Sequence, residues 1–265
     1  MLGLGNSLTY AAAPGGYVNT HSMVFDGDHS GGGGGDYLRS AINLQTIMRT
    51  GNFSITAWVR FTDGRRNPPQ TIMGARSDSG NWFNFINSKI SGKLGFSIKA
   101  NSDQCDTFSD SAVFVDGQTD WHHVAVTVQT AGLSSSESVI TLYVDGDAVP
   151  STTNPAITRA NLELLDMSSQ TEFGVGAFIA AGTPSDNLGG EIDELTVFST
   201  NLSPPQIDQM YAATDLEEEF ASNASLLSRF DGWWKFDNTL GNSRDPGGND
   251  MIIVNNAAFS TDVHS

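Results

Sequence analysis

Three carboxylates fall within four residues of the stretch 189–199, which reads GGEIDELTVFS. They are Glu191, Asp193 and Glu194, and the residues around them predict a β-strand. Two carboxyl groups about 5 Å apart perform retaining glycoside hydrolysis, one as nucleophile and the other as acid and base. The stretch is therefore either the catalytic strand of a polysaccharide hydrolase or a core strand of a domain that only binds.

The alternation of side chains along a strand favours the second alternative. Successive residues point to opposite faces, so Glu191 and Asp193 are expected on one face and Glu194 on the other. The next position on the first face holds no carboxylate, because residue 195 is leucine and residue 196 is threonine. We expect an incomplete hydrolase pair, no catalytic residue and no enzymatic activity.

Other reactive side chains lack suitable partners. Cys105 lies in the polar stretch 101–110, which is expected to be a loop without a nucleophile motif. His122 and His123 are adjacent in an expected strand, so they face opposite ways and cannot both bind one metal ion. The glycine run 31–35 follows an acidic turn between strands, which argues against a phosphate-binding loop.

Short strands are the elements that must position these residues. The clearest is 53–61, where five apolar residues alternate with Ser54, Thr56, Trp58 and Arg60. Further strands are predicted at 21–27, 36–41, 70–75, 81–87, 93–100, 111–115, 121–129, 138–149, 171–179, 189–199, 231–236 and 251–254.

A helix is expected only late in the chain. Residues 202–213 fit one with Ser203 as N-cap, and 215–230 extend it or form a second helix. An Asp145–Gly146 turn predicts a hairpin. About ten short strands in 265 residues imply one all-β domain, a two-sheet antiparallel jelly-roll sandwich with one or two short C-terminal helices.

Charge is distributed unevenly along the sequence. Residues 1–100 carry 9 basic and 5 acidic side chains, whereas residues 101–228 carry one basic and 20 acidic side chains. The net charge of −17 repels phosphate backbones and argues against a nucleic-acid partner. It suits a saline or calcium-rich medium or a basic protein partner, and solubility alone also explains it.

The sequence also bears on the compartment. No apolar run approaches the roughly 20 residues that cross a bilayer, so no membrane insertion is expected. No basic residue precedes Arg39, so the positive region of a secretory signal is missing. The single cysteine cannot form an internal disulfide, which favours synthesis in a reducing cytoplasm.

Five motifs occur in the order found in laminin-G-like, concanavalin A-like jelly-roll domains. They are FDG…DYL, FSITAWVRF, WHHVAVTV, ITLYVDGDAV and GGEIDELTVFSTNLSPPQIDQMY. The chain resembles this family over residues 21–213. The resemblance implies that residues 1–20 are an N-terminal arm and that 214–265 hold a helical linker and a terminal strand pair. That pair completes the same sandwich or contacts a neighbour.

The family resemblance also bears on the carboxylates. Retaining β-glucanases of this fold space their acids as E-x-D-x-E or E-x-D-x-x-E, and this chain departs from both patterns after Asp193. In a laminin-G-like domain, Asp193 would accept hydrogen bonds near a sheet edge while Leu195 and Val197 fill the core. A retaining β-glucanase is the least favoured alternative.

The two ends of the chain are similar to those of laminin-G-like virion proteins of tailed phages from marine bacteria. This resemblance implies a non-enzymatic structural protein of the capsid or tail, made in the host cytoplasm and then part of the virion. Its partners would be other capsid or tail subunits and further copies of itself, with attachment to host-surface polysaccharide as a second role. The alternative is a calcium-dependent carbohydrate-binding lectin or adhesin.

A virion protein that attaches to polysaccharide and a lectin would both need ligand-binding residues. Relatives hold Ca²⁺ at the sandwich rim with loop carboxylates, and turn formation by Asp-Gly pairs is the competing explanation for such residues. The candidate calcium ligands are Asp26, Asp28 and Asp36 in one loop and Asp103, Asp106 and Asp110 in another. The candidate aromatic platforms for a glycan, each of which core packing also explains, are Trp58, Trp82 and Trp121.

Overall fold

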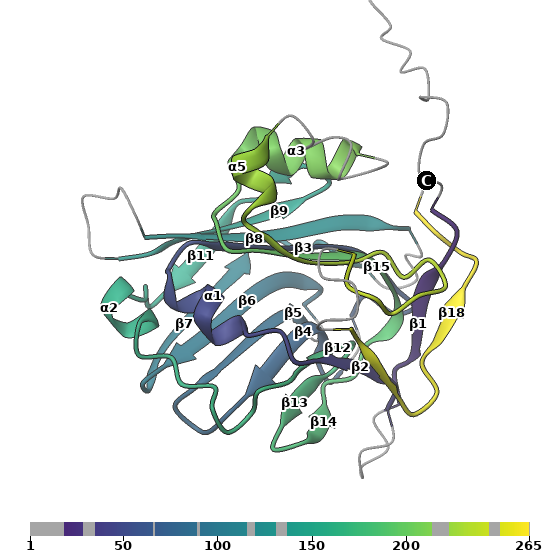
Figure 1. Ribbon diagram of the computed structural model, residues 1–265, viewed down its shortest axis with the longest axis horizontal. Coiled ribbons are helices and arrows are strands. Elements are labelled where there is room, and N and C mark those ends of the chain that lie inside the picture. The colour runs from purple at the N-terminus through teal and green to yellow at the C-terminus, as the bar shows by residue number, and fades with distance from the viewer. Residues whose placement is uncertain are drawn as a thin grey trace, which may run out of the picture.

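The computed structural model describes eight segments of the chain (Figure 1). They are residues 19–28, 35–65, 67–88, 91–115, 120–130, 137–213, 223–243 and 250–264. Most of the expected N-terminal arm, most of the glycine run and the first part of the expected 215–230 helix lie outside these segments.

Two β-sheets pack face to face, and almost all strand pairs are antiparallel. Sheet A has the order β10 (Asp147–Ala148), β9 (Val139–Val144), β8 (His122–Gln129), β3 (Phe53–Phe61), β15 (Gly189–Phe198), β1 (Ser22–Asp26) and β18 (Ala258–Ser260), with β16 (Phe230–Trp234) also on β15. The sandwich predicted from the sequence is confirmed.

The second sheet contains the remaining strands. Sheet B has the order β11 (Ser151–Asn154), β7 (Asp103–Ser109), β6 (Lys93–Ala100), β5 (Trp82–Ser88), β4 (Gln70–Arg76), β12 (Phe173–Val175), β2 (Tyr37–Ser40) and β17 (Ile252–Val254). A hairpin of β13 (Phe178–Ala180) and β14 (Thr183–Ser185) joins β4 through a parallel pairing.

The core lies between the two sheets, where the alternation of β3 is realised. Its five apolar residues, Phe53, Ile55, Ala57, Val59 and Phe61, are all buried in the main apolar cluster. Burying each large apolar side chain stabilises the fold by about 1.5–3 kcal/mol. The alternate residues therefore project from the outer face of sheet A.

Two short helices cover part of that outer face, α3 (Pro204–Ala212) and α5 (Ala224–Leu227) (Figure 1). Ile207 and Met210 of α3 pack in a second apolar cluster with Trp233 of β16. Ser203 begins α3, where the Gln206 side-chain oxygen accepts hydrogen bonds from the Ser203 N–H and hydroxyl. The helix predicted at 202–213 is confirmed.

Two helices were not predicted, α1 (Leu44–Arg49) and α2 (Arg159–Leu162). They contain six and four residues, too few for a helical period to stand out in the sequence. The only local signal for α1 is Asn43, whose side chain accepts a hydrogen bond from the N–H of Thr46. The sequence therefore gave too little pattern to predict either helix.

Three strand predictions were inexact. Residues 111–115 form no strand, whereas the polar stretch expected to be a loop forms β7. The predicted strand 171–179 is divided at Gly176, whose positive φ of 78° turns the chain from β12 toward β13. The hairpin predicted at Asp145–Gly146 is confirmed by the pairing of β10 with β9.

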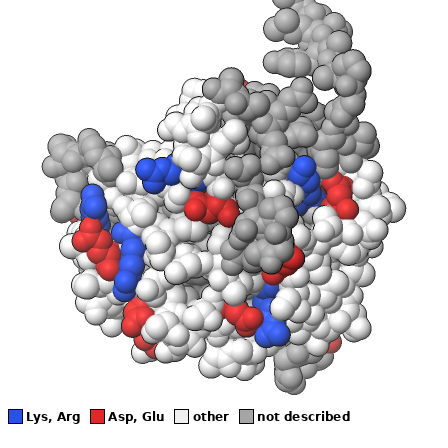
Figure 2. Space-filling view, viewed as in Figure 1, with Lys and Arg blue, Asp and Glu red and all other residues white. Residues whose placement is uncertain are grey.

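The C-terminal strands pair within their own chain. β16 lies on β15, β17 lies on β2, and β18 lies on β1 at the right of Figure 1. None of the helices in the described part of the chain has the length and apolarity of a membrane-spanning helix. On the face seen in Figure 2, acidic and basic side chains lie close to one another on a largely uncharged surface.

Candidate functional site

The three carboxylates of β15 all lie on the outer face of sheet A. Glu191 and Asp193 pair in register with Arg60 and Trp58 of β3, which project outward. The register shifts after Asp193, and Glu194 has a positive φ of 49°. This β-bulge inserts an extra residue and returns Glu194 to the face of its neighbours. The expectation that Glu194 faces the other way was therefore wrong.

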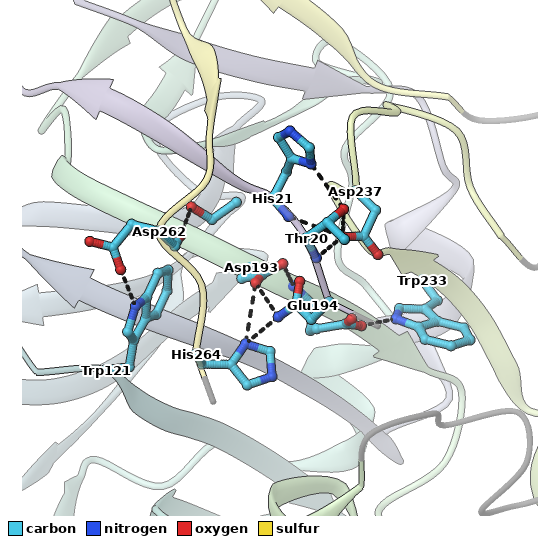
Figure 3. A network of polar contacts seen from close by, with 11 residues as sticks. Thr20, His21, Trp121, Asp193, Glu194, Trp233, Asp237, Asp262 and His264 are labelled. Carbon is cyan, nitrogen blue, oxygen red and sulfur yellow. Dashed lines mark hydrogen bonds and ion pairs between the residues drawn. The ribbon is translucent and has the colours of Figure 1, made fainter. Parts of the chain in front are cut away.

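Asp193 lies at the centre of a buried polar network (Figure 3). Its carboxyl group is fully buried and accepts hydrogen bonds from the Asn19 side-chain amide at 2.8 Å and from the N–H of Glu194 at 2.9 Å. Burial raises its pKa to about 8. The carboxyl group is therefore protonated at neutral pH, and it lies on a central strand rather than near a sheet edge.

His264 covers this carboxyl group. Its Nδ1 atom lies 3.2 Å from Asp193 Oδ2 and 2.9 Å from the Asn19 amide nitrogen. Its ring stacks on Trp58, with centroids 4.2 Å apart and planes 10° apart. Burial lowers the pKa of His264 to about 4, so the imidazole is neutral.

Glu191 is held by an arginine rather than left open. Arg60 bridges two carboxylates, Glu191 at 2.6 Å and Asp262 at 2.7 Å. The Trp121 indole lies 5.5 Å from the Arg60 guanidinium and donates a hydrogen bond to Asp262 at 3.4 Å. Burial raises the pKa of Glu191 despite the nearby guanidinium.

Glu194 and the residues before β1 complete the network. The Trp233 indole donates a hydrogen bond to Glu194, and both side chains are buried. The Asp237 carboxylate accepts hydrogen bonds from the backbone N–H groups of Thr20 at 2.6 Å and His21 at 3.1 Å. These contacts tie the segment before β1 to the loop after β16 (Figure 3).

The three carboxylates are closed to a substrate. Glu191, Asp193 and Glu194 are 5%, 0% and 8% exposed, and each contacts side chains of its own chain. The cavity that remains between Trp58, Glu194 and the surrounding residues has a volume of about 10 Å³. This is room for one water molecule, not for a sugar ring.

The predicted aromatic platforms separate onto the two sheets. Trp58 lies beneath His264, and Trp121 lies beside Arg60, so both belong to the closed face of sheet A. Trp82 begins β5, is partly exposed, and meets Phe178 of β13 edge to face with centroids 6.4 Å apart. All three tryptophans are partly exposed, and Trp82 is the one that lies on sheet B, away from this network.

The outer face of sheet B surrounds Trp82 with polar and aromatic side chains. Trp82 pairs in register with Lys99, and Asn84 pairs with Ser97 and Gly74. The Asn84 side chain is 6% exposed, and its carbonyl oxygen is buried without a hydrogen-bond partner. Of the residues on this face, Trp82 and Asp106 were singled out from the sequence, whereas Asn84 was not.

Two glycines allow aromatic rings to lie against this face. A Cβ atom at Gly95 would lie 2.3 Å from the Phe108 ring, and one at Gly74 would lie 2.9 Å from both Phe178 and the Asn84 carbonyl oxygen. The rings of Phe108 and Phe178 thus occupy space that a side chain on the neighbouring strand would fill. Sequence periodicity gave no sign of this, because it does not show which strands are neighbours.

A surface cavity of about 290 Å³ opens beside α1. Several of its polar groups are already bonded within the chain. The Gln45 side-chain oxygen accepts the Met167 N–H at 2.5 Å, and Arg39 pairs with Glu172 at 3.2 Å. The Gln45 oxygen and the Glu172 carboxylate of this cavity are therefore already bonded within the chain and less available to a ligand.

The first candidate calcium set serves to hold turns. Asp26 accepts hydrogen bonds from the N–H groups of Asp28 at 2.9 Å and Asp36 at 3.4 Å, and Asp36 accepts one from Asn256 at 2.7 Å. Residues 29–34 lie outside the described segments. Across the described residues, no cluster of three or more metal-ligating side chains occurs, and calcium binding stays a prediction.

The second candidate calcium set lies on and just after a strand. Asp103 and Asp106 of β7 are three residues apart, so they face opposite sides of it. Asp103 accepts a hydrogen bond from Asn161, Asp106 one from Gln104 at 2.8 Å, and Asp110 one from Thr152 at 2.7 Å. Cys105, on the same strand rather than in a loop, is fully buried, which raises its pKa to about 11.

Comparison with known families agrees with this architecture. Residues 32–208, more than half of the chain, match the laminin G family described as the concanavalin A-like lectin/glucanases superfamily. The chain belongs to this superfamily. None of the curated proteins matches it.

Solved structures share the fold of this superfamily member at low sequence identity. A Bacteroides ovatus ATCC 8483 protein proposed to bind carbohydrate has a TM-score of 0.61 and 15% identity, covering 94% of this chain and 61% of that one. A heptameric SAP-like pentraxin from Limulus polyphemus has a TM-score of 0.50 and 10% identity, covering 92% and 95%. The CBM40 of the Ruminococcus gnavus IT-sialidase has a TM-score of 0.48 and 14% identity, covering 72% and 96%.

These identities establish the fold alone. The chain spans 61% of the length of the Bacteroides ovatus protein. Activity, ligands and partners must therefore be argued from the residues of this chain.

Proposed function

We propose that this superfamily member is a carbohydrate-binding module that does not cleave its ligand. The observation that carries the proposal is the closure of β15, where Glu191, Asp193 and Glu194 are buried against side chains of the same chain. A retaining hydrolase needs two carboxyl groups exposed to one sugar. The structural likeness to a Bacteroides ovatus protein proposed to bind carbohydrate is consistent with a binding role.

The outer face of sheet B is the proposed binding surface. α3 and α5 lie over sheet A, on the opposite side of the sandwich (Figure 1). On sheet B, the partly exposed rings of Trp82, Phe108 and Phe178 supply apolar surface for sugar rings. Lys99 and Asp106 on the same face supply a donor and an acceptor for hydroxyl groups.

Asn84 is the polar group on this face whose hydrogen bonding a ligand would complete. Its buried carbonyl oxygen lacks a hydrogen-bond partner, which costs about 1–3 kcal/mol relative to a satisfied group. It lies beside Phe178, which meets Trp82 edge to face. When the neighbouring Phe178 ring moves aside, a sugar hydroxyl can donate to this oxygen while the apolar side of the sugar lies on the aromatic rings.

A glycan array tests the proposal. We expect wild-type protein to bind at least one oligosaccharide, and Trp82→Ala to lower that affinity by about 5- to 150-fold, since losing ring contact removes about 1–3 kcal/mol. Leu164→Ala, at an exposed residue of the loop after α2, is the control and should bind like the wild type. A parallel array with chelator separates calcium-dependent from calcium-independent binding.

Two results would contradict the proposal. One is silence of the wild-type protein on every glycan, with and without calcium. The other is release of reducing sugar from a bound polysaccharide that is lost in Glu191→Gln, because that outcome requires an open carboxylate.

Placement on a phage virion remains a prediction from the sequence. The pairing of β16, β17 and β18 with strands of their own chain neither requires nor opposes it. Mass spectrometry of purified virions tests it directly, and absence of the chain from the particles would remove this role while leaving carbohydrate binding intact.

A further inference from the structure

The segment 258–264 begins as the edge strand β18 of sheet A and then reaches over the outer face of that sheet, fastened along its length. β18 pairs with β1, the Ser22 hydroxyl donates a hydrogen bond to the Asp262 carbonyl at 2.6 Å, and Arg60 pairs with the Asp262 carboxylate at 2.7 Å. The segment then ends its described course at His264 (Figure 3), whose ring lies over Trp58. The position of His264 thus decides whether the Trp58 ring is covered.

The contacts of His264 fix the location of one proton. The Asn19 amide nitrogen lies within hydrogen-bond distance of both Asp193 Oδ2 at 2.8 Å and His264 Nδ1 at 2.9 Å. An amide nitrogen only donates, so Nδ1 accepts and carries no proton of its own. Nδ1 and Asp193 Oδ2 are 3.2 Å apart, and the proton between them must therefore belong to the Asp193 carboxyl group.

We propose that Asp193 and His264 form a latch, closed by the single proton between them, that holds the 258–264 segment over Trp58. With that proton present, a neutral carboxyl group donates to a neutral imidazole. Without it, the carboxylate either faces the Nδ1 lone pair or must draw the imidazole proton onto Nδ1, where that proton would face the N–H of Asn19. Loss of one proton therefore releases His264 from the ring of Trp58.

Other ionisable groups around the pair do not supply a substitute proton. Those described on the surrounding elements are Arg60, His123, Glu191, Glu194, Asp237 and Asp262, with the Tyr211 ring of α3 against Trp58. Asp237 and Glu191 further raise the pKa of Asp193, because their negative charges oppose a third one. Arg60 is already bonded to two carboxylates.

The pKa values give the pH at which the latch opens. In the closed state Asp193 has a pKa of about 8 and His264 of about 4, against ordinary values of 3.8 and 6.5. Between pH 4 and pH 6.5, the closed state holds one proton on Asp193 and the open state one on His264, so the balance does not change. Above pH 6.5 only the closed state keeps its proton, and closure is lost as the pH rises to 8.

Hydrogen exchange of the 258–264 segment measures this opening. After correction for the intrinsic pH dependence of exchange, we expect opening to be constant from pH 5 to pH 6.5 and to increase by up to roughly 30-fold by pH 8.5, about tenfold per pH unit over the window. Amides of α2, distant from the latch in sequence, serve as the control and should show no such step.

Two variants give the latch distinct pH profiles. Asp193→Asn keeps a donor for Nδ1 but removes the titrating carboxyl group, so only His264 titrates and closure is lost as the pH falls from 6.5 to 4. His264→Gln keeps an acceptor but removes the imidazole, so closure is lost steadily as the pH rises from about 4 to 8. Compared with the wild type, the change of opening with pH therefore reverses its sign in Asp193→Asn. In His264→Gln it keeps its sign and extends to lower pH.

A wild-type profile without a step between pH 6.5 and pH 8.5 would overturn the latch. So would the complete wild-type profile, flat below pH 6.5 and rising above it, in either variant, because the shared proton would then not be its cause. If Asp193→Asn fails to fold, His264→Gln still decides, since its substitution lies in a segment without regular structure.

Discussion

The hydrogen bond from the Trp233 indole to Glu194 joins the bulge of β15 to the second apolar cluster. Glu194→Ala removes the acceptor and should lower the free energy of unfolding by about 1–3 kcal/mol, measured by urea denaturation. Glu194→Gln keeps a side-chain oxygen for the indole and should lose less. Glu163→Gln, at the exposed C-cap of α2 where Glu163 pairs with Arg159, is the control for removing a charge. Equal losses in the Ala and Gln variants would show that the bond does not stabilise the bulge.

Glu194 also shows which feature of the site could not be predicted from the sequence. Alternation correctly placed Glu191 and Asp193 together on one face, and the family resemblance correctly placed Leu195 and Val197 in the core. It failed at Glu194, because a bulge depends on the register between β15 and β3, and that register is not written in either strand alone. Nothing in the stretch, such as a glycine at the bulge, signalled the irregularity.

His264 could not have been found from the sequence. It is 71 residues from Asp193 and 206 from Trp58 along the chain, yet it contacts both side chains. Such contacts arise from tertiary packing of a segment without periodicity. The long-range part of the site therefore required the structure, whereas the strand carrying its carboxylates did not.

At the scale of elements, α3 covers part of the outer face of sheet A and packs against it. Ile207 is fully buried against the second apolar cluster. Ile207→Ala should lower the free energy of unfolding by about 2–5 kcal/mol, since it leaves a cavity beneath the helix. Gln209→Ala, exposed on the same helix, should change it by less than about 0.5 kcal/mol. A matching loss in both variants would mean that the burial of Ile207 is not what secures α3.

The elements that were predicted correctly have either a strong alternation of apolar and polar residues or residues that mark the start of a helix. The 53–61 strand has five alternating apolar residues, and the late helix has a serine followed by two prolines. β7 was mistaken for a loop because polar residues dominate it, with Thr107 and Ser109 buried beside Cys105. Buried polar residues in a strand give the same sequence pattern as an exposed loop.

At the scale of the whole molecule, the two outer faces of the sandwich differ. Sheet A is covered by α3, α5 and the 258–264 segment, and its carboxylates are closed. Sheet B presents Trp82, Phe108 and Phe178 with the unsatisfied carbonyl oxygen of Asn84 between strands. A division of this kind fits a domain that binds on one face and uses the other to hold residues 19–21 and 258–264.

The most direct test of this account is a nuclear magnetic resonance titration with the glycan that binds best on the array. We expect the shifted backbone amides to cluster on β4, β5, β6, β7 and β13, around Trp82 and Asn84, while the glycan signals broaden and stay intact. Shifts centred instead on β3 and β15, together with signals of a newly formed reducing end, would contradict a non-cleaving module that binds through sheet B.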